Sequence, residues 1–380
     1  MRILHTGDWH LGRIFHGIHL TNDQAYLLDQ FVSLVHDTSP DAVLIAGDVY
    51  DRGVPPTDAV QLLDETVSRI IIDCRTPLLL IAGNHDSPQR LRFGNKLLAR
   101  QELFICGSPL DYPSPLVLYD QSGPVYFSLL PFTEPGTLRQ WLALPEGTDQ
   151  NNATNALIKK HLAEIPQGVR KVALAHAYVS GGTVSESERP LSIGGVSPME
   201  TDSFRDYHYV ALGHLHQAQQ LGTNLFYSGS LLKYSFSEVH HRKSVSLMEI
   251  DETGQLSLEK ISLTPRRDLR TITGYFADIL ANPPTEFSRE DYLMVTLKDD
   301  GPILDAISRL REIFPNILHI ERPALQSRGQ IPEPGGDHRQ TGDLDLFSTF
   351  FTQVTGNDLT EDEAKVFAAT VSTYVTREDK

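Results

Sequence analysis

Five short apolar runs in the first 265 residues constrain the fold of this chain more than any other feature. All are rich in Val, Ile and Leu, which is typical of strands buried on both faces of a sheet. They are Arg2–Thr6, Ala42–Ala46, Leu78–Ala82, Val172–Ala175 and Tyr209–Leu212. Amphipathic stretches at Thr21–His36 and Thr57–Ile72 separate the first three runs and have helical spacing. This alternation predicts a layered α/β domain over residues 1–265.

Local signals refine this picture. Thr21-Asn22-Asp23 offers candidate caps for the first helix. Phe104–Phe132, which Gly and Pro interrupt repeatedly, predicts antiparallel strands and turns within the same domain. Leu221–Ile261 predicts further strands with a turn at Thr253-Gly254. These segments would complete the first domain.

Each apolar run is followed by residue types that bind metal ions. The five endings are Asp8-Trp9-His10, Gly47-Asp48, Gly83-Asn84-His85-Asp86, His176 and Gly213-His214-Leu215-His216. Sites in open α/β sheets form beyond the carboxyl ends of strands, so five distant segments would deliver side chains to one place. A single Asp or His after a strand is usually a turn former or a surface residue. Five in the same relative position, with glycines that let the backbone turn tightly, predict a shared site.

The chemistry of this set indicates which ions it could hold. Carboxylates, imidazoles and one amide, without a thiolate, suit Mn²⁺, Fe or Zn²⁺. One carboxylate between two groups of ligands suits a bridged pair of ions. Two ions about 3.5–4 Å apart stabilise the attacking and leaving oxygens of a phosphoryl displacement. They also lower the pKa of a bound water, so that hydroxide forms near neutral pH. The set therefore predicts a two-metal phosphoesterase.

The order of motifs D-x-H, G-D, G-N-H-D, H and G-H-x-H resembles that of the calcineurin-like metallophosphoesterases. The resemblance implies a β-sandwich flanked by helices, with Asp48 bridging the two ions. It implies one ion on Asp8, His10, Asp48 and His216, and another on Asp48, Asn84, His176 and His214. His85 would contact the scissile phosphate and help the leaving oxygen depart. Asp86 would either orient His85 or cap the helix that starts near Ser87-Pro88.

Longer sequence segments resemble those of the SbcD nucleases within that superfamily. They are His5–Gly12, Ala46–Asp51, Ala82–Pro88, Tyr209–His216, Tyr227–Ser230 and Tyr234–Glu238, with Leu231 where the family usually has Pro. The resemblance implies a Mn²⁺-dependent DNA phosphodiesterase of DNA repair and recombination. It would be a 3′-5′ exonuclease on duplex DNA and an endonuclease on single strands or hairpins. Its partner would be SbcC, a coiled-coil ATPase, with a homodimer of this chain inside a heterotetramer.

The rest of the chain divides into three further segments. Residues 266–322 predict a small α/β module, which resembles a DNA-capping domain. Residues 323–343 are rich in Gly and Pro and predict a linker. Residues 344–380 predict a helical tail, with helices at Leu344–Val354 and Thr360–Val375. Two short helices cannot form a core alone, so the tail with the phenylalanines at 347, 350 and 351 is expected to dock on another surface. The resemblance implies that this surface belongs to SbcC.

The net charge of −16 is unusual for a protein that grips DNA by itself. Bound cations and the partner would supply positive charge. Five basic residues either form a local basic strip near the site or are ordinary charged surface residues. They are Arg13, Arg52, Arg90, Arg92 and Lys96. The stretch Arg90–Leu98 would also suit a dimer interface, as the family resemblance implies.

Two features of the composition concern the compartment. Two cysteines are too few for a disulfide framework and favour a reducing compartment. The N-terminus has no signal-peptide pattern, and no apolar run approaches the roughly 20 residues that cross a bilayer. We therefore expect a soluble, cytoplasmic protein without a membrane segment.

Two classes of protein compete with the nuclease interpretation. One is a two-metal phosphodiesterase for nucleotides or cyclic nucleotides, which would not need the module and the tail. The other is a non-enzymatic scaffold, for which all seven ligands would be unexpected. Trp9 could stack on a base or pack under the metal loop, and packing is the simpler interpretation. His240-His241 indicates a basic turn rather than a third metal site.

Overall fold

The structure is a computed structural model that describes residues 1–188, 198–301, 303–323, 344–345, 347–348, 351–352 and 358–378. The chain divides into two compact units, Met1–Asp268 and Leu269–Lys380. The linker expected at 323–343 lies, apart from Pro323, outside the described residues. So does much of the first tail helix expected at Leu344–Val354, including Phe350.

Two six-stranded sheets form the centre of the first unit in its described part. The first sheet has the order β14 (Leu256–Ser262), β13 (Ser244–Ile250), β1 (Arg2–Thr6), β4 (Ala42–Ile45), β5 (Leu78–Ile81), β6 (Leu103–Cys106). The second has the order β11 (Gln219–Leu221), β12 (Leu225–Tyr227), β10 (Tyr209–Gly213), β9 (Arg170–His176), β8 (Gly123–Leu130), β7 (Leu116–Asp120). A core with apolar side chains from both sheets, such as Leu44 and Phe127, lies between them.

The five apolar runs form the parallel strands β1, β4, β5, β9 and β10, as expected. Strand β8 is also parallel to β9, and β6 is parallel to β5. The prediction of antiparallel strands over Phe104–Phe132 is therefore right for the hairpin of β7 and β8 but wrong for β6. Parallel neighbours end at the same edge of a sheet, so residues after these strands come close together.

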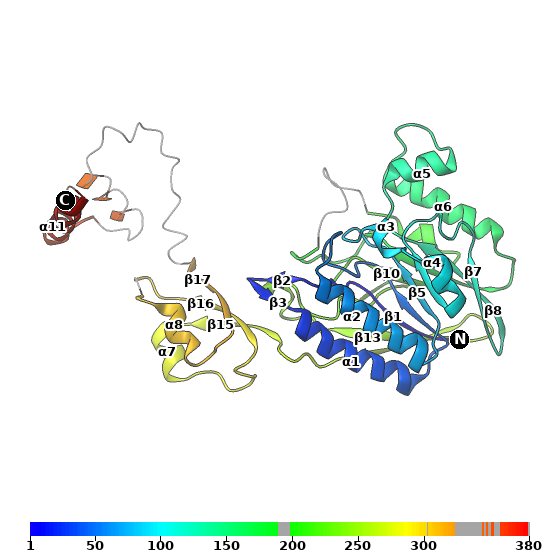
Figure 1. Cartoon of the computed structure of the whole chain (residues 1–380), viewed down its shortest axis with the longest axis horizontal. Helices are drawn as coiled ribbons and strands as arrows, with labels where there is room; N and C mark the ends of the chain where they lie inside the picture. The colour runs from blue at the N-terminus through cyan, green and yellow to red at the C-terminus, as the bar shows by residue number, and fades with distance from the viewer. Residues whose placement is uncertain are drawn as a thin grey trace. The chain divides into compact units, whose positions relative to one another are not determined.

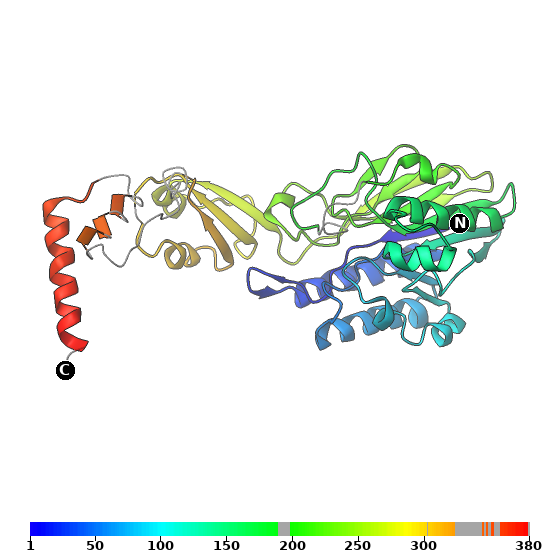
Figure 2. The same ribbon diagram turned by 90° about the horizontal axis from the view of Figure 1, so that it is seen from above.

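Helices cover both outer faces of the sandwich (Figures 1 and 2). Helices α1 (Thr21–Thr38) and α2 (Thr57–Ser68) lie on one side, and α5 (Pro135–Leu142) and α6 (Gln150–Glu164) on the other. The shorter elements are β2 (Ile14–Phe15), β3 (Ile18–His19), η1 (Arg69–Asp73), α3 (Pro88–Leu91), α4 (Asn95–Leu98), η2 (Ala99–Gln101), η3 (Thr201–Phe204) and η4 (Phe236–Glu238). The layered fold predicted from the sequence is confirmed.

The start of α1 differs from the expectation. Its cap residue is Leu20, and no side chain caps the helix. The Thr21 hydroxyl instead donates a hydrogen bond to Asp58 at 2.9 Å, and Asp23 lies 3.4 Å from Arg267. The polar residues at this end therefore tie the helix to α2 and to the segment that leaves the domain.

The second unit has a core of its own. Its described residues form a three-stranded parallel sheet, β15 (Leu269–Gly274), β16 (Tyr292–Leu297) and β17 (Ile317–Glu321), with helices α7 (Phe276–Ala281) and α8 (Ala306–Arg311). Buried side chains from β16, such as Val295, pack with Leu310 and Phe314. Helix α7 was not predicted. The tail helix expected at Thr360–Val375 corresponds to α11 (Glu361–Glu378).

Candidate metal centre

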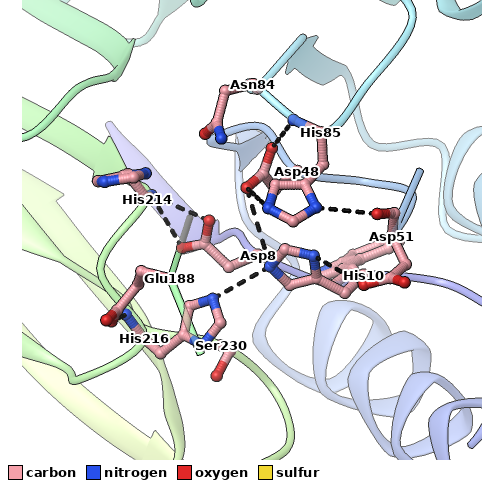
Figure 3. A network of polar contacts seen from close by, with 12 residues as sticks. Asp8, His10, Asp48, Asp51, Asn84, His85, Glu188, His214, His216 and Ser230 are labelled. Carbon is pink, nitrogen blue, oxygen red and sulfur yellow. Dashed lines mark hydrogen bonds and ion pairs between the residues drawn. The ribbon is translucent and has the colours of Figure 1, made fainter. Parts of the chain in front are cut away.

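The loops after five parallel strands meet at one edge of the sandwich (Figure 3). Six expected ligands lie there: Asp8 and His10 after β1, Asp48 after β4, Asn84 after β5, and His214 and His216 after β10. The seventh, His176, ends β9 and lies 3.6 Å from Asp48. Among the residues that the structure describes, three groups have ligand atoms within 4.8 Å of one another, namely Asp8, His10, His216; Asp8, Asp48, His176; and His10, Asp51, His85. The structure thus brings side chains from all five loops together.

Asp48 occupies the position between the two expected halves of the site. Its Oδ2 lies 3.8 Å from His10 Nε2 and 3.6 Å from His176 Nε2. On one side, His10 Nε2 is 3.0 Å from His216 Nε2. On the other, His176 Nε2 is 2.9 Å from the Asn84 side-chain oxygen. One carboxylate therefore faces donors of both halves.

His214 contributes to the site through its backbone as well as its ring. Its backbone N–H donates to both carboxylate oxygens of Asp8, at 2.9 and 3.1 Å. Its ring centroid lies 5.5 Å from that of His176. Among the described residues, its imidazole belongs to none of the three tight groups. His214 thus holds Asp8 through its backbone while its ring borders the half of the site that contains His176.

Four of these residues have a strained backbone. The φ angles are +52° at Asp8, +46° at His10, +48° at Asp48 and +105° at His214, values that non-glycine residues rarely adopt. Such a residue costs about 1–3 kcal/mol and persists only where its surroundings hold it. Here backbone hydrogen bonds from Asp8 to Gly47 and from His10 to Asp48 hold the loops at 3.0 and 2.9 Å. Four of the ten non-glycine residues with positive φ in the described part of the chain are expected ligands, which indicates that the backbone is shaped for the site.

The glycines beside the ligands have two separate roles. Among these three glycines only Gly47 has a positive φ, at +89°, a left-handed conformation that favours glycine. Gly83 and Gly213 provide room instead. A Cβ on Gly83 would lie 2.1 Å from Asp48 Oδ1, and one on Gly213 would lie 1.9 Å from the Ala46 carbonyl oxygen. Gly47 thus allows a left-handed backbone, whereas Gly83 and Gly213 allow the loops to pack closely.

The hydrogen bonds of His176 show that the site fits a cation. Its Nδ1 lies 2.8 Å from the Ala46 carbonyl oxygen, which can only accept, so Nδ1 carries the proton. Burial lowers the pKa of His176 to about 4, so the ring is neutral near pH 7 and Nε2 is an unprotonated acceptor, yet it faces the oxygens of Asn84 and Asp48. Acceptors that face one another repel unless a cation lies among them. The donor set of carboxylates, imidazoles and an amide oxygen fits divalent metal ions.

Electrostatics supports the same conclusion. Burial raises the pKa of Asp8 well above its ordinary value, and the neighbouring Asp48 carboxylate raises it further. Burial lowers the pKa of His10, and the nearby His216 and His85 lower it further. Buried carboxylates beside neutral imidazoles are unfavourable without positive charge, and a bound cation reverses this balance.

Comparisons with known proteins decide the family. The family model described as calcineurin-like phosphoesterase matches residues 1–218, and the model described as type 5 capsule protein repressor C-terminal domain matches residues 265–355. The chain is 33% identical over 366 residues to the D subunit of the nuclease SbcCD from Staphylococcus saprophyticus, covering 96% of each chain. The same protein from Staphylococcus epidermidis is 31% identical over 379 residues, covering 100% of each. This chain belongs to the SbcD family of calcineurin-like phosphoesterases.

Family membership confirms the resemblance seen in the motifs and the expected enzyme class, a metal-dependent phosphoester hydrolase. More distant similarities extend to solved structures. TT1561 of Thermus thermophilus has a TM-score of 0.40 at 15% identity, covering 68% of this chain and 98% of that one. A dimetal phosphatase from Danio rerio has a TM-score of 0.40 at 12% identity, covering 70% and 96%.

His85 lies beside the metal centre of this SbcD-family chain, and the Asp51 backbone orients its ring. His85 Nδ1 is 2.8 Å from the Asp51 carbonyl oxygen, and its backbone N–H donates to Asp48 Oδ1 at 2.9 Å. The His85 and His10 ring centroids are 4.6 Å apart. Because a carbonyl accepts, the Nδ1 proton points to Asp51, and Nε2 lies on the side of Asp48, 3.9 Å from Oδ2.

Asp86 holds backbone amides. Its carboxylate accepts hydrogen bonds from the N–H groups of Val49, Tyr50 and Gly83 at 2.9–3.1 Å. It thus joins the loops after β4 and β5, whereas the contact we expected it to make with the His85 ring is made by the Asp51 carbonyl. The alternative that Asp86 caps a helix is wrong, because the cap residue of α3 is Ser87. Burial and then Asp48 raise the pKa of Asp86 to about 7.

Several residues that support the site were not predicted. Gln24 donates to the backbone oxygens of Trp9 and His10 at 3.0 and 2.8 Å. Glu188 accepts from the His216 backbone N–H at 2.7 Å, and Glu238 lies 3.2 Å from His216 Nδ1. Glu238 lies in the segment Tyr234–Glu238, which resembles the family. This resemblance was the one signal in the sequence that pointed to any of these supporting residues.

Other expected features can also be placed. Trp9 is fully buried, donates to Thr6 at 2.9 Å and packs edge-on to Phe31, which confirms the packing interpretation. Two members of the possible basic strip are engaged in ion pairs. Arg13 pairs with Asp51 and Arg92 with Asp111, at 2.8 and 2.7 Å.

Proposed function

We propose that this chain hydrolyses DNA phosphodiesters with two Mn²⁺ ions. It would act as a 3′-5′ exonuclease on duplex DNA and as an endonuclease on single strands or hairpins, together with an SbcC-type ATPase in DNA repair and recombination. The observation that carries the proposal is Asp48, which faces donors of both halves of the site. It does so in a chain that matches the D subunit of the nuclease SbcCD along its whole length.

The same contacts support the assignment of ligands. One ion would be held by Asp8, His10, Asp48 and His216, and the other by Asp48, Asn84, His176 and His214. Hard carboxylate oxygens combined with imidazoles suit Mn²⁺. When bound, the two cations supply an activated water and neutralise charge on the phosphate. The His214 backbone amide holds Asp8 in place, and the Ala46 carbonyl fixes the tautomer of His176.

His85 is the proposed general acid of the reaction. The Asp51 carbonyl holds its Nδ1 proton, so Nε2 is presented on the side of the site where Asp48 lies. A protonated Nε2 there can hydrogen-bond a phosphate oxygen and give its proton to the departing oxygen. Asp86 would keep the two loops in register so that His85 and Asp48 stay at this spacing.

The remaining segments have proposed roles in assembly. Residues 266–322 would cap DNA, residues 323–343 would link, and residues 344–380 would dock on the ATPase. The stretch Arg90–Leu98 would form a homodimer interface inside a heterotetramer, because Phe93 and Leu97 expose 86% and 72% of their surface there. A DNA substrate implies action in the cytoplasm. Within the residues described, no helix has the length and apolar character that crossing a bilayer requires.

The test uses the full chain with Mn²⁺ on hairpin DNA, on blunt duplex DNA and on bis(p-nitrophenyl) phosphate, with and without the ATPase. Asp48→Asn should abolish hydrolysis and weaken the binding of both ions. His85→Ala should bind both ions and slow hydrolysis by at least about 100-fold, the usual contribution of a general acid. His36→Ala, which removes an exposed histidine on α1, is the control and should change neither.

Two results would contradict the proposal. Hydrolysis of the small diester without any cleavage of DNA would favour the alternative, a phosphodiesterase for nucleotides. A His85→Ala variant with two bound ions and a nearly normal rate would exclude His85 as the acid.

A further inference from the structure

A buried ion pair lies directly behind His216. Glu238 is fully buried, and the Lys243 side chain is 7% exposed. Lys243 Nζ lies 2.5 Å from Glu238 Oε2 and also donates to the Ser230 hydroxyl and the His216 carbonyl oxygen, both at 2.8 Å. The ammonium group therefore has three acceptors, and its contact with Glu238 uses Oε2.

The other carboxylate oxygen of Glu238 faces the His216 ring. Glu238 Oε1 accepts a hydrogen bond from the Ser187 hydroxyl and lies 3.2 Å from His216 Nδ1. The Ser187 oxygen itself is 2.8 Å from Nδ1. Because the Ser187 proton is already given to Glu238, both oxygens near Nδ1 are acceptors. His216 must then carry its proton on Nδ1.

In the neutral ring, a proton on Nδ1 leaves Nε2 of His216 unprotonated, with its lone pair facing the site. Nε2 lies 3.0 Å from His10 Nε2 and belongs to the tight group with Asp8. The backbone of the same residue is held as well, since its N–H donates to Glu188 and its carbonyl accepts from Lys243. Hydrogen bonds on the side away from the metal centre thus fix both the ring and the backbone of His216.

A buried ion pair gives little stability by itself, because the loss of hydration offsets the attraction. Because this pair lies behind one of the expected ligands, we infer that its role is something other than stability. Partners of ligand histidines set the tautomer and raise the basicity of the ring, and their loss typically weakens metal binding by about 10–100-fold. The separate use of the two Glu238 oxygens matches such a role.

We propose that Glu238, held by Lys243 and assisted by Ser187, is a positioning residue that prepares His216 to bind one of the two metal ions. This inference rests on the proposed function, since it requires the two-metal site. We expect Glu238 to strengthen binding of the ion held by Asp8, His10 and His216. Binding of the ion held by Asn84 and His176 should not depend on Glu238.

The experiment is a calorimetric titration of the metal-free full chain with Mn²⁺. Glu238→Gln should weaken one of two sites by about 10–100-fold and leave the other within about twofold. Ser187→Ala, which removes a hydroxyl and no charge, should weaken the same site by a smaller factor. It provides a second measurement where Glu238→Gln folds poorly.

A double variant separates positioning from simple charge balance. If Glu238 only neutralised Lys243, removing both charges in Glu238→Gln/Lys243→Met would restore Mn²⁺ affinity. We expect the affinity to stay low, because the neutral amide of glutamine does not replace the carboxylate beside His216 Nδ1. Asp120→Asn is the matched control. It breaks the buried pair with Arg170 at the opposite end of β8 and β9 and should leave both sites unchanged.

The outcomes distinguish this inference from the function on which it rests. Two unchanged sites in Glu238→Gln, or full recovery in the double variant, would overturn the positioning role while the two-metal function stands. Equal weakening of both sites in Glu238→Gln and in Asp120→Asn would show general destabilisation and would also overturn it. A wild-type chain that binds fewer than two ions would overturn the proposed function and this inference together.

Discussion

His161 is a buried histidine with no role in the proposed chemistry. It lies on α6, and neither ring nitrogen has a hydrogen-bond partner within the described part of the chain. Burial lowers its pKa from 6.5 to about 4. Below pH 6.5 the unfolded chain binds a proton at this position, whereas the folded protein does so only near pH 4. The contribution of His161 to stability is therefore present above pH 6.5 and is lost as the pH falls toward 4.

We expect His161→Met to reduce this sensitivity to acid. Methionine fills similar space without a titrating group, so stability at pH 7 should change by less than about 1.5 kcal/mol. Between pH 7 and 4 the free energy of unfolding should fall by about 3 kcal/mol less in the variant than in the wild type. The reason is that folding lowers the pKa of His161 from 6.5 to about 4. Urea unfolding at both pH values measures the difference. His36→Met on the exposed surface of α1 is the control, and an identical pH slope in His161→Met would contradict the argument.

At the residue scale, the ligand types could be predicted, but their supports could not. Asp8, Asp48 and His176 follow apolar runs, and this local pattern is visible in sequence. Glu238 and Lys243 are ordinary charged residues within a stretch that indicates a basic turn. They gain their role because folding places Ser187 and Glu238 in contact across 51 positions. Hydrogen bonds of this kind depend on tertiary packing, which one sequence does not display.

At the scale of elements, strand positions followed from composition because buried parallel strands need continuous apolar runs. Among the five apolar runs, β1 agrees residue for residue with its prediction, and β4, β5 and β10 differ by one residue at the C-terminal end. Strand β9 begins two residues earlier and ends one residue later than predicted. The end of α2 was less predictable. Thr57–Ile72 has one helical pattern, yet the last turn is a π-helical segment, η1. Helix α7 is a single short element whose few apolar residues give too little periodicity to detect.

The close contact between the loops after β4 and β5 gives the next prediction. We expect Gly83→Ala to disrupt the site, because its Cβ would lie 2.1 Å from Asp48 Oδ1 and 2.4 Å from the Asp48 backbone nitrogen. Overpacking of this kind typically costs about 1–3 kcal/mol, and moving Asp48 should also weaken both Mn²⁺ ions. Thermal unfolding and Mn²⁺ titration measure the two effects.

Gly136→Ala is the matched control for that substitution. Gly136 lies in the first turn of α5, and the nearest group to its Cβ would be the tip of Arg139 at 3.8 Å. Alanine is favoured over glycine in a helix by roughly 0.5–1 kcal/mol, so this variant should be slightly more stable and bind Mn²⁺ normally. A Gly83→Ala variant with the same behaviour would show that the two loops can separate without loss of the site.

At the scale of the whole molecule, the net charge of −16 limits how this chain can meet DNA. Two divalent cations add only four positive charges, and Arg13 and Arg92 are in ion pairs with carboxylates. Steering of a polyanion to the site is therefore expected to depend on positive charge from another chain. If the tail docks on that chain as proposed, activity on DNA would require the tail as well as the metal centre.

The tail offers a surface on which this dependence can be tested. Phe347 stacks on Phe367 with centroids 3.9 Å apart, and both line an apolar groove of about 490 Å³ with Val366, which is 68% exposed. We expect Val366→Asp to weaken binding of the SbcC-type ATPase by at least about 30-fold, the effect of losing a central contact of about 2 kcal/mol. Ala368→Asp puts the same charge on another face of α11 and should bind normally. Mn²⁺ affinity and cleavage of a small diester should stay at wild-type levels in both, because the metal ligands lie in the other unit. Normal ATPase binding by Val366→Asp would remove the groove from the docking surface.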